Sequence, residues 1–441
     1  MKSRSAWDRT SRMQEVIPMK HRSPYSLVDV KAVDVERIAQ RLGGQRCVVG
    51  VDVAKAEPVA CVYGPERQFE RPWRVRSPGQ IGLLVEKIGQ LRRAGPLVVA
   101  MESSGTYGDP LRQALADQAI SVERVSAKAV KDHAETFDGV PSQHDGKDAA
   151  VIGELCWRGH GRPWDWRELP EFDQALRYWV RKLDTAQRIQ QVYAGKLEAL
   201  LARHWPEATG LLKASGATLP GALAHWGDPR KLAADPAAGA LLGQWGGRYL
   251  KVAKIEAVRA AAAATVGVRM NAWQVREVQE TALAILARRR QIRACRRQLR
   301  KLTRGQQVIQ AQAPAAGLVT ACVLWMCLGD VRNYPSAAAY RKAMGLNLKE
   351  RSSGQYKGRL RLSKRGQRLT RKWLYFSALR WMRVPAVKAW VQRKKQRDGG
   401  KGSKAVVGVM RRLALALWSV GKDGVAFDAG RLFPGRPCQA A

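Results

Sequence analysis

The stretch CVVGVDVAK, residues 47–55, decides how the first part of the chain is interpreted. Its closely spaced valines form the short apolar run that is typical of a buried strand, and Asp52 is the only acidic residue within the run. An ionised carboxylate taken out of water costs several kcal/mol unless it is paired or binds a metal ion. Asp52 therefore either points to a solvated edge of the sheet or helps to hold a cation, depending on whether other carboxylates lie beside it.

The composition predicts a polyanionic partner. The 441 residues include 77 Lys and Arg against 37 Asp and Glu, which gives a formal net charge of +40. Such an excess is typical of proteins that bind nucleic acid with an affinity that falls as salt rises. A non-catalytic binding protein or a cationic membrane protein would share this excess, so the charge alone does not identify a reaction.

The chain shows no sequence sign of a membrane span or of a zinc site. No run of about 18 apolar residues is present, and the basic N-terminal stretch lacks the apolar core of a secretory signal. The seven cysteines are scattered, without a CxxC pair or a His/Cys cluster. We therefore expect reduced, buried thiols in a cytoplasmic protein that has no membrane partner.

The pattern of the first third of the chain predicts an α/β domain at residues 45–165, preceded by a basic N-terminal extension at 1–44. The expected strands are 46–54, 57–64, 69–75, 96–102 and 121–126, and the expected helices are 77–93 and 108–118. Three consecutive strands followed by alternation with helices indicate a mixed sheet covered by helices. The same order is found in ribonuclease-H-like nuclease domains, and many other α/β folds can imitate it.

Three further carboxylates belong to elements that can converge on Asp52. Glu102 ends a predicted strand, and ligands gather at strand ends in open α/β sheets. Asp145 and Asp148 lie three residues apart at the start of an apolar helix, so they share one helix face. Helix capping is the alternative role for this pair. Together the four residues predict a site for Mg²⁺ or Mn²⁺, which can polarise a phosphodiester.

The remainder of the chain is predicted to be mainly helical. We assign residues 166–305 to a helical, coiled-coil-like linker and dimerisation region, and residues 306–441 to a C-terminal domain. The main expected helices are 171–204, 271–303, 318–328, 370–382 and 404–420, with a basic turn at 388–404. The basic run at 287–304 either binds nucleic acid or is a solvated helix face, and the residues do not decide between these roles.

Residues 349–366, KERSSGQYKGRLRLSKRG, form a basic loop with glycines that leads to a helix, a composition that suits phosphate binding. The candidate nucleic-acid-binding residues are Lys349, Arg351, Lys357, Arg359, Arg361, Lys364 and Arg365. A serine beside a glycine in such a loop is either a phosphate contact or a nucleophile. From the residues alone, the phosphate contact is the more common role.

Three motifs resemble the acidic blocks of the DEDD transposases of the "IS one-ten" insertion-sequence family, also called bridge-RNA-guided recombinases. The motifs are GVDVAK (50–55), ESSGTYG (102–108) and HDGKDA (144–149), in the order of the family. Gln143 and His144 stand where the family usually has Lys-Thr, and both aspartates are kept. The resemblance implies a RuvC-like fold for the first domain and metal binding by Asp52, Glu102, Asp145 and Asp148.

The C-terminal region resembles the transposase domain of the same family. Ser353-Gly354, followed by Ser363-Lys364-Arg365-Gly366, is similar to the segment whose serine attacks DNA and forms a covalent phosphoserine intermediate. The resemblance implies that Ser353 is the nucleophile, and Ser352 is a neighbour that the sequence does not exclude. It also implies donor and target DNA as substrates, a structured noncoding bridge RNA as guide, and a homodimer or tetramer as the working unit.

The expected function is that of an insertion-sequence transposase or recombinase, an enzyme that cuts and rejoins DNA. Its expected catalytic residues are Asp52, Glu102, Asp145, Asp148 and Ser353. A metal-dependent Holliday-junction resolvase, which would use the carboxylates and water without a covalent step, is one alternative. A non-catalytic, basic nucleic-acid-binding protein is the other.

Overall fold

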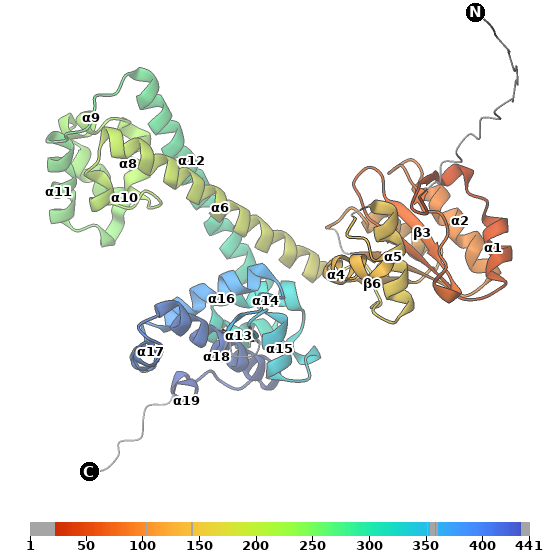
Figure 1. The fold of residues 1–441 in the computed structure, drawn as a ribbon. Helices are drawn as coiled ribbons and strands as arrows, with labels where there is room; N and C mark the ends of the chain where they lie inside the picture. Colours follow the sequence, from red (N-terminus) through yellow and green to blue (C-terminus); the bar gives the residue numbers. More distant parts are fainter. Residues whose placement is uncertain are drawn as a thin grey trace, which may run out of the picture. The chain divides into compact units, whose positions relative to one another are not determined.

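The computed structural model describes residues 23–102, 105–142, 144–350, 352, 358 and 360–433. The chain divides between Glu168 and Leu169 into two compact units. The first unit contains a β-sheet covered by helices, and the second is almost entirely helical (Figure 1). This arrangement confirms the predicted combination of an α/β domain with a helical remainder.

The first unit is built on a six-stranded mixed sheet. Its strands are β1 (Val28–Asp29), β2 (Cys47–Asp52), β3 (Val59–Tyr63), β4 (Trp73–Arg74), β5 (Leu97–Glu102) and β6 (Val122–Val125). Their order across the sheet is β1-β4-β3-β2-β5-β6. The central strand β2 is antiparallel to β3 and parallel to β5, and β5 is parallel to β6. The predicted mixed sheet of the ribonuclease-H-like type is therefore confirmed.

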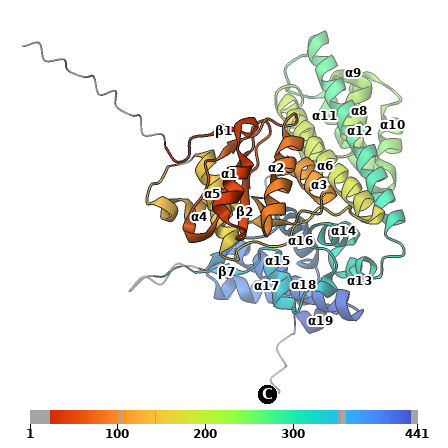
Figure 2. The same cartoon turned by 90° about the vertical axis from the view of Figure 1, so that its right-hand side faces the viewer.

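Helices cover both faces of this sheet (Figure 2). One face packs against α1 (Val35–Leu42), α2 (Ile81–Ala94) and α3 (Asp109–Asp117), and the other packs against α4 (Ala127–Asp138) and α5 (Asp145–Trp157). Side chains alternate between the two faces along a strand. Each buried strand is therefore apolar on both sides, as the valine-rich sequence of β2 requires.

Residues 23–44 are part of this unit, whereas the sequence analysis placed them in an N-terminal extension. Val28 of β1 pairs with Trp73 of β4, and the short 3-10 helices η1 (Val30–Ala32) and η2 (Pro65–Arg67) lie in the connections. Helix α1 buries Val35 and Ile38 in the same core as α2. The sheet domain begins before residue 45 because these apolar side chains complete its core.

Two long helices, α6 (Glu171–His204) and α12 (Ala272–Leu302), lie side by side in the second unit (Figure 1). The short helices between them in the chain are α7 (Ala208–Leu211), α8 (Thr218–Trp226), α9 (Pro229–Ala234), α10 (Ala238–Gly246), η3 (Gly247–Tyr249) and α11 (Val252–Ala263). One buried cluster joins Leu201 of α6, Leu223 of α8 and Ile285 of α12. The predicted long helices at 171–204 and 271–303 are confirmed.

The last part of the second unit forms its own core against the opposite ends of α6 and α12. Its elements are α13 (Gln307–Ala316), α14 (Leu318–Leu328), η4 (Val331–Asn333), α15 (Ala337–Ala343), β7 (Leu348–Lys349), β8 (Arg361–Leu362), α16 (Arg368–Trp381), α17 (Pro385–Arg397), α18 (Gly402–Asp423) and α19 (Ala429–Leu432). The predicted basic turn at 388–404 is wrong over most of its length, because α17 extends to Arg397. Pro385 starts this helix, and Val387 and Val391 are buried against its neighbours.

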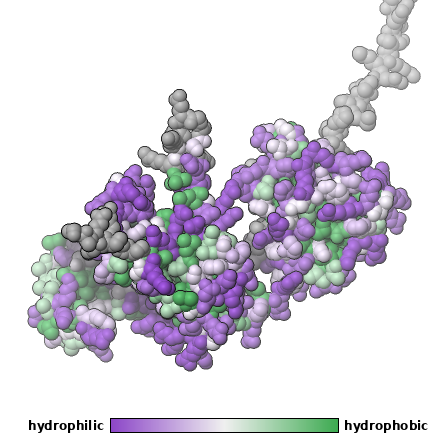
Figure 3. Space-filling model, turned by 90° about the horizontal axis from the view of Figure 1, so that it is seen from below, coloured by the Kyte–Doolittle hydropathy of each residue, from purple (hydrophilic) through white to green (hydrophobic). Residues whose placement is uncertain are grey.

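Hydrophilic residues cover most of the face shown in Figure 3, and hydrophobic residues form smaller, separate areas on it. In the part of the chain that the structure describes, no helix has both the length and the apolar character that a bilayer crossing requires.

Candidate active site

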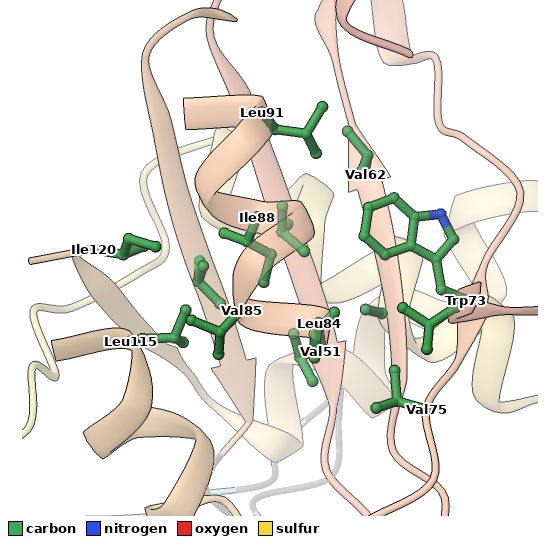
Figure 4. Packing of buried hydrophobic residues seen from close by; sticks show 14 of the residues in the cluster. Val51, Val62, Trp73, Val75, Leu84, Val85, Ile88, Leu91, Leu115 and Ile120 are labelled. Carbon is green, nitrogen blue, oxygen red and sulfur yellow. The ribbon is translucent and has the colours of Figure 1, made fainter. Parts of the chain in front are cut away.

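Asp52 and Glu102 end two neighbouring parallel strands. Val51 of β2 pairs with Met101 of β5, so the residues that follow them, Asp52 and Glu102, lie side by side at the carboxyl ends of the strands. Val51 belongs to the core on the α2 face (Figure 4), and Met101 belongs to the same buried cluster. Because side chains alternate, the two carboxylates leave the sheet on the opposite face, which α5 covers.

Helix α5 approaches β2 unusually closely because glycines face each other across the contact. A Cβ added to Gly50 would lie 2.1 Å from the carbonyl oxygen of Ala149 and 2.6 Å from the backbone nitrogen of Gly153. A Cβ added to Gly153 would lie 2.8 Å from the Cβ of Tyr63 in β3. Neither position has room for a side chain, so the two glycines set the distance between helix and sheet.

This contact places the start of α5 beside the end of β2. Asp145 is the first residue of the helix, and Asp148 belongs to its first turn. The N-cap residue is His144, whose Nδ1 accepts a hydrogen bond from the Gly146 N–H at 3.1 Å. Neither aspartate serves as the N-cap, although both lie in the first turn, where the helix dipole favours negative charge.

The negative charges of the four carboxylates act on one another. The pKa of Asp52 is raised to about 7, first by burial and then by the negative charges of Asp148, Glu102 and Asp145. Burial followed by the charge of Asp148 also raises the pKa of Glu102. Burial and the charge of Asp145 raise the pKa of Asp148, while Lys147 opposes this shift. The site is therefore short of positive charge.

The donor atoms suit a hard divalent cation, although they do not form a closed cage. Over the described ranges, no three or more His, Cys, Asp or Glu side chains are arranged to hold a metal ion together. Mg²⁺ is usually bound by one or two carboxylates together with water and substrate phosphates, and it does not require a cage of protein ligands. The carboxylates of Asp52, Glu102, Asp145 and Asp148 fit that mode of binding.

A cavity of about 390 Å³ lies between α4 and α5 beside two of these carboxylates. Glu102 and Asp148 line one part of it, and Lys131 and Glu135 of α4 line another. Helix α4 was not expected from the sequence, so this wall of the cavity was not predicted. The signal that was available is Ser126, a residue type that favours helix N-termini, ahead of a segment that buries Val130.

The buried lysine Lys147 anchors the start of α5. Its side chain is fully buried, and its ammonium group donates hydrogen bonds to Asp138 Oδ1 at 2.7 Å and to the Val140 carbonyl at 2.5 Å. The Tyr25 hydroxyl donates to the other oxygen of Asp138 at 2.7 Å. Lys147 thus ties the loop before α5 to the end of α4 from a position between Asp145 and Asp148.

The buried carboxylate of Glu154 fixes the middle of the same helix. It accepts hydrogen bonds from Arg158 at 2.6 Å and from Arg67 at 2.9 Å, and its second oxygen lies 2.8 Å from His133 Nε2. Burial alone would raise the pKa of Glu154, but the hydrogen bonds from His133 and Arg67 hold it below its ordinary value. Neither Lys147 nor Glu154 was singled out from the sequence, because burial of a charged residue is a tertiary property.

The basic stretch 349–366 belongs to the second unit. The antiparallel strands β7 and β8 pair across this stretch, which places Lys349 opposite Arg361. Ser352, Lys364 and Arg365 are exposed. The predicted residues that lie outside the described part of the chain are Arg351, Ser353, Lys357 and Arg359.

Family models match two parts of the chain. Residues 49–206 match a transposase model for IS110-type DEDD enzymes, and residues 309–394 match the model described as "Transposase IS116/IS110/IS902 family". Together the matches cover more than half of the 441 residues. No curated protein matches the chain.

One solved structure that is similar to part of the chain is T. thermophilus RuvC in complex with a Holliday junction substrate. The identity is 15%, and the match covers 27% of this chain and 99% of that one, with a TM-score of 0.22. A score this low supports no conclusion about function.

The sheet, its acidic strand ends and the two matched regions define a DNA transposase of the DEDD class. The chain belongs to the IS110 family of transposases, as its three acidic motifs predicted, and its activity is that of a DNA transposase or recombinase.

Proposed function

We propose that Asp52, Glu102, Asp145 and Asp148 bind divalent metal ions, Mg²⁺ or Mn²⁺, and that this site cleaves DNA strands during transposition. The observation that carries the proposal is the convergence of these carboxylates at one end of the sheet, where burial and the charges of Asp148, Glu102 and Asp145 raise the pKa of Asp52 to about 7. Anions brought together in this way are stabilised by a cation between them. A bound divalent ion would supply a Lewis acid for the phosphoryl oxygens.

The residues of the site are held on rigid elements. Asp52 and Glu102 are fixed by the pairing of β2 and β5, and Asp145 and Asp148 are fixed by α5. The cavity beside Glu102 and Asp148 has room for a phosphodiester, and because Lys131 is outnumbered by acidic residues on its wall, a bound cation would be needed to offset the negative charge. Preorganised charges of this kind favour a transition state because they need not rearrange as the reaction proceeds.

In the second unit, we propose that Ser353 is the nucleophile. Its Oγ attacks the phosphorus of the scissile phosphodiester, and the bond between phosphorus and the leaving sugar oxygen breaks as the phosphoserine ester forms. The serine proton ends on the released sugar hydroxyl. The reverse attack by another sugar hydroxyl regenerates the serine and rejoins the DNA, so the exchange needs no external energy source. The support is the motif Ser353-Gly354 and its basic surroundings, including Lys349 and Arg361.

The proposed partners are donor DNA, target DNA and a structured noncoding bridge RNA that selects them by base pairing. The net charge of +40 supports a nucleic-acid partner, and the RNA rests on the family resemblance alone. The same resemblance supports a homodimer or tetramer in which the carboxylate site of one subunit serves the serine of another. Because each active site would then combine residues of two subunits, activity would depend on oligomer assembly.

The experiment that tests this function is the capture of a covalent protein–DNA adduct. The full-length protein is incubated with end-labelled donor and target DNA, cellular RNA and Mg²⁺, then denatured and resolved by electrophoresis. We expect an adduct with the wild type that disappears in EDTA and in the Asp52→Asn and Ser353→Ala variants. Peptide mapping of the adduct identifies the serine, and Ser352→Ala is the matched control that retains it.

Two outcomes would favour other mechanisms. Metal-dependent cleavage that persists in Ser353→Ala without an adduct would indicate a resolvase-like reaction with water as the nucleophile. Cleavage and adduct formation that persist in Asp52→Asn and Glu102→Ala would show that the carboxylates have no part in the reaction.

A further inference from the structure

A cationic groove lies in the second unit, lined by none of the residues assigned above to catalysis. It consists of two adjoining hollows of about 600 Å³ and 300 Å³, which share Arg296 and Phe376 as lining residues. The first hollow lies among α6, α12 and α16, and the second continues to the start of α14. We call it the α6–α12–α16 groove.

Arginines of α12 form one wall of this groove. The side chains of Arg289, Arg293 and Arg296 line the first hollow, and Arg296 and Arg300 line the second. Their spacing of four, three and four residues places them on one face of the helix. The stripe is about 16 Å long at 1.5 Å per residue. A stripe of this length can contact several successive phosphates of one nucleic-acid strand.

The charges of this stripe are not balanced by the protein. No lining residue of either hollow is acidic. Among the described residues, the four arginines form no ion pair, whereas Arg276 near the start of the same helix pairs with Glu280 at 2.9 Å. Burial and the nearby charge of Arg293 lower the pKa of Arg289. The groove therefore concentrates positive charge that can attract an anion from outside the chain.

The groove also contains an aromatic platform. Phe376 of α16 lines both hollows, and its side chain remains 49% exposed. Its ring is held edge-on to that of Trp373, with ring centroids 5.9 Å apart. Lys372, one turn before Phe376, is bound to Asp184 of α6 at 2.5 Å, which fixes α16 against the opposite wall. The ring also lies edge-on to that of Tyr375, and the part of it that remains exposed faces the groove.

We infer that the α6–α12–α16 groove binds a single strand of nucleic acid, with its phosphates along the arginine stripe and a base stacked on Phe376. Cationic tracks that carry exposed aromatic side chains are the usual means of binding unpaired strands. In a duplex the bases are stacked on one another and cannot reach Phe376. The inference goes beyond strand cleavage and does not depend on it, because binding here requires neither the carboxylates nor Ser353.

The test measures binding by the full-length protein in EDTA, so that catalysis plays no part. Fluorescence anisotropy is recorded with labelled 20-nucleotide oligo-U, oligo-dT and a 20-base-pair duplex at several salt concentrations. For Arg293→Ala/Arg296→Ala, we expect the slope of log affinity against log salt for single strands to fall by about 1.4, that is about 0.7 per phosphate contact. Phe376→Leu should weaken single-strand binding about tenfold and leave duplex binding unchanged.

The matched control is Arg290→Ala/Arg297→Ala, which removes two exposed arginines of the same helix that do not line the groove. The inference is supported if the groove variants change single-strand binding and the control does not. The relative affinities for oligo-U and oligo-dT then assign the strand to RNA or to DNA. It is overturned if both arginine pairs change the salt slope equally, if Phe376→Leu has no effect on single strands, or if an acidic peptide competes better than either oligonucleotide.

Discussion

In β2, Gly50 lies so close to α5 that a Cβ at position 50 would stand 2.1 Å from the carbonyl oxygen of Ala149. Glycine in the interior of a strand normally weakens it, and its presence here marks a close approach of two backbones. The approach brings the first turn of α5, with Asp145 and Asp148, to the end of the strand that carries Asp52. The geometry of the acidic site therefore depends on a residue without a side chain.

Substituting Gly50 by alanine should displace α5 and impair cleavage. The atoms that a methyl group would meet belong to backbone and cannot rotate away. We expect a loss of about 1–3 kcal/mol in the free energy of unfolding, typical of overpacking, and a cleavage rate reduced at least tenfold. Urea unfolding and a DNA cleavage assay measure the two effects. Gly89→Ala in α2, where no atom lies within 4 Å of the new Cβ, is the control. Equal behaviour of both variants would refute the role of Gly50.

The stability of the metal-free protein should fall as pH rises from about 4 to about 7. Asp52 holds its proton up to about pH 7 in the folded state, against an ordinary pKa of 3.8. The folded protein therefore binds more protons than the unfolded chain in this window, and deprotonation across it removes stability. Asp52→Asn should match the wild type near pH 4 and be more stable at pH 8. Thermal unfolding in EDTA measures this, and parallel curves for the two proteins would contradict it.

Divalent ions should reverse this loss of stability. At pH 8 the ionised carboxylates are available to bind Mg²⁺ or Mn²⁺. An ion that binds only the folded state stabilises that state by mass action. The gain is about 2.7 kcal/mol when the ion concentration is 100 times its dissociation constant. We expect the melting temperature of the wild type to rise with Mn²⁺ and that of Asp52→Asn/Asp148→Asn to stay constant. An equal rise in both proteins would place the bound ion elsewhere.

Removing the Glu154 carboxylate should destabilise the first unit. Its partners Arg67, Arg158 and His133 would lose a buried acceptor. Arg67 and Arg158 are largely exposed and can be hydrated after the change, so we expect Glu154→Ala to cost about 1–3 kcal/mol and to shift the urea midpoint by a corresponding amount. Glu86→Ala, at an exposed position of α2, should change stability by less than about 0.5 kcal/mol. Similar midpoints for the two variants would show that the Glu154 network contributes little.

Lys147→Met should move the acid limb of the cleavage profile to higher pH. The ammonium group of Lys147 opposes the rise in the pKa of Asp148, so its removal should raise that pKa further. The variant should also be less stable, because Asp138 and the Val140 carbonyl lose their buried donor. Lys128→Met removes an exposed lysine of α4 that pairs with Asp132, and it should leave the profile unchanged. An unchanged pH profile of cleavage in Lys147→Met would show that this lysine does not influence the acidic site.

Much of the fold was predictable because its signals are local. The apolar runs of β2 and β5 identify buried strands, and the seven-residue spacing of apolar side chains in α12 identifies a long helix. The errors have equally local causes. Strand β1 has only two residues, α4 buries a single side chain, and most of the basic stretch predicted as a turn at 388–404 belongs to the helix that Pro385 begins.

The sequence by itself determined the order of the acidic motifs, the excess of basic residues and the family, because these are properties of residue identity and spacing. Only the tertiary structure decided that Asp52, Glu102, Asp145 and Asp148 share one end of the sheet, since their approach depends on strand register and on the contact at Gly50. It also decided which charges are buried, as for Lys147 and Glu154, and which arginines of α12 face a common groove. Burial and the field of neighbouring charges arise when distant segments pack together, so no stretch of the chain contains them.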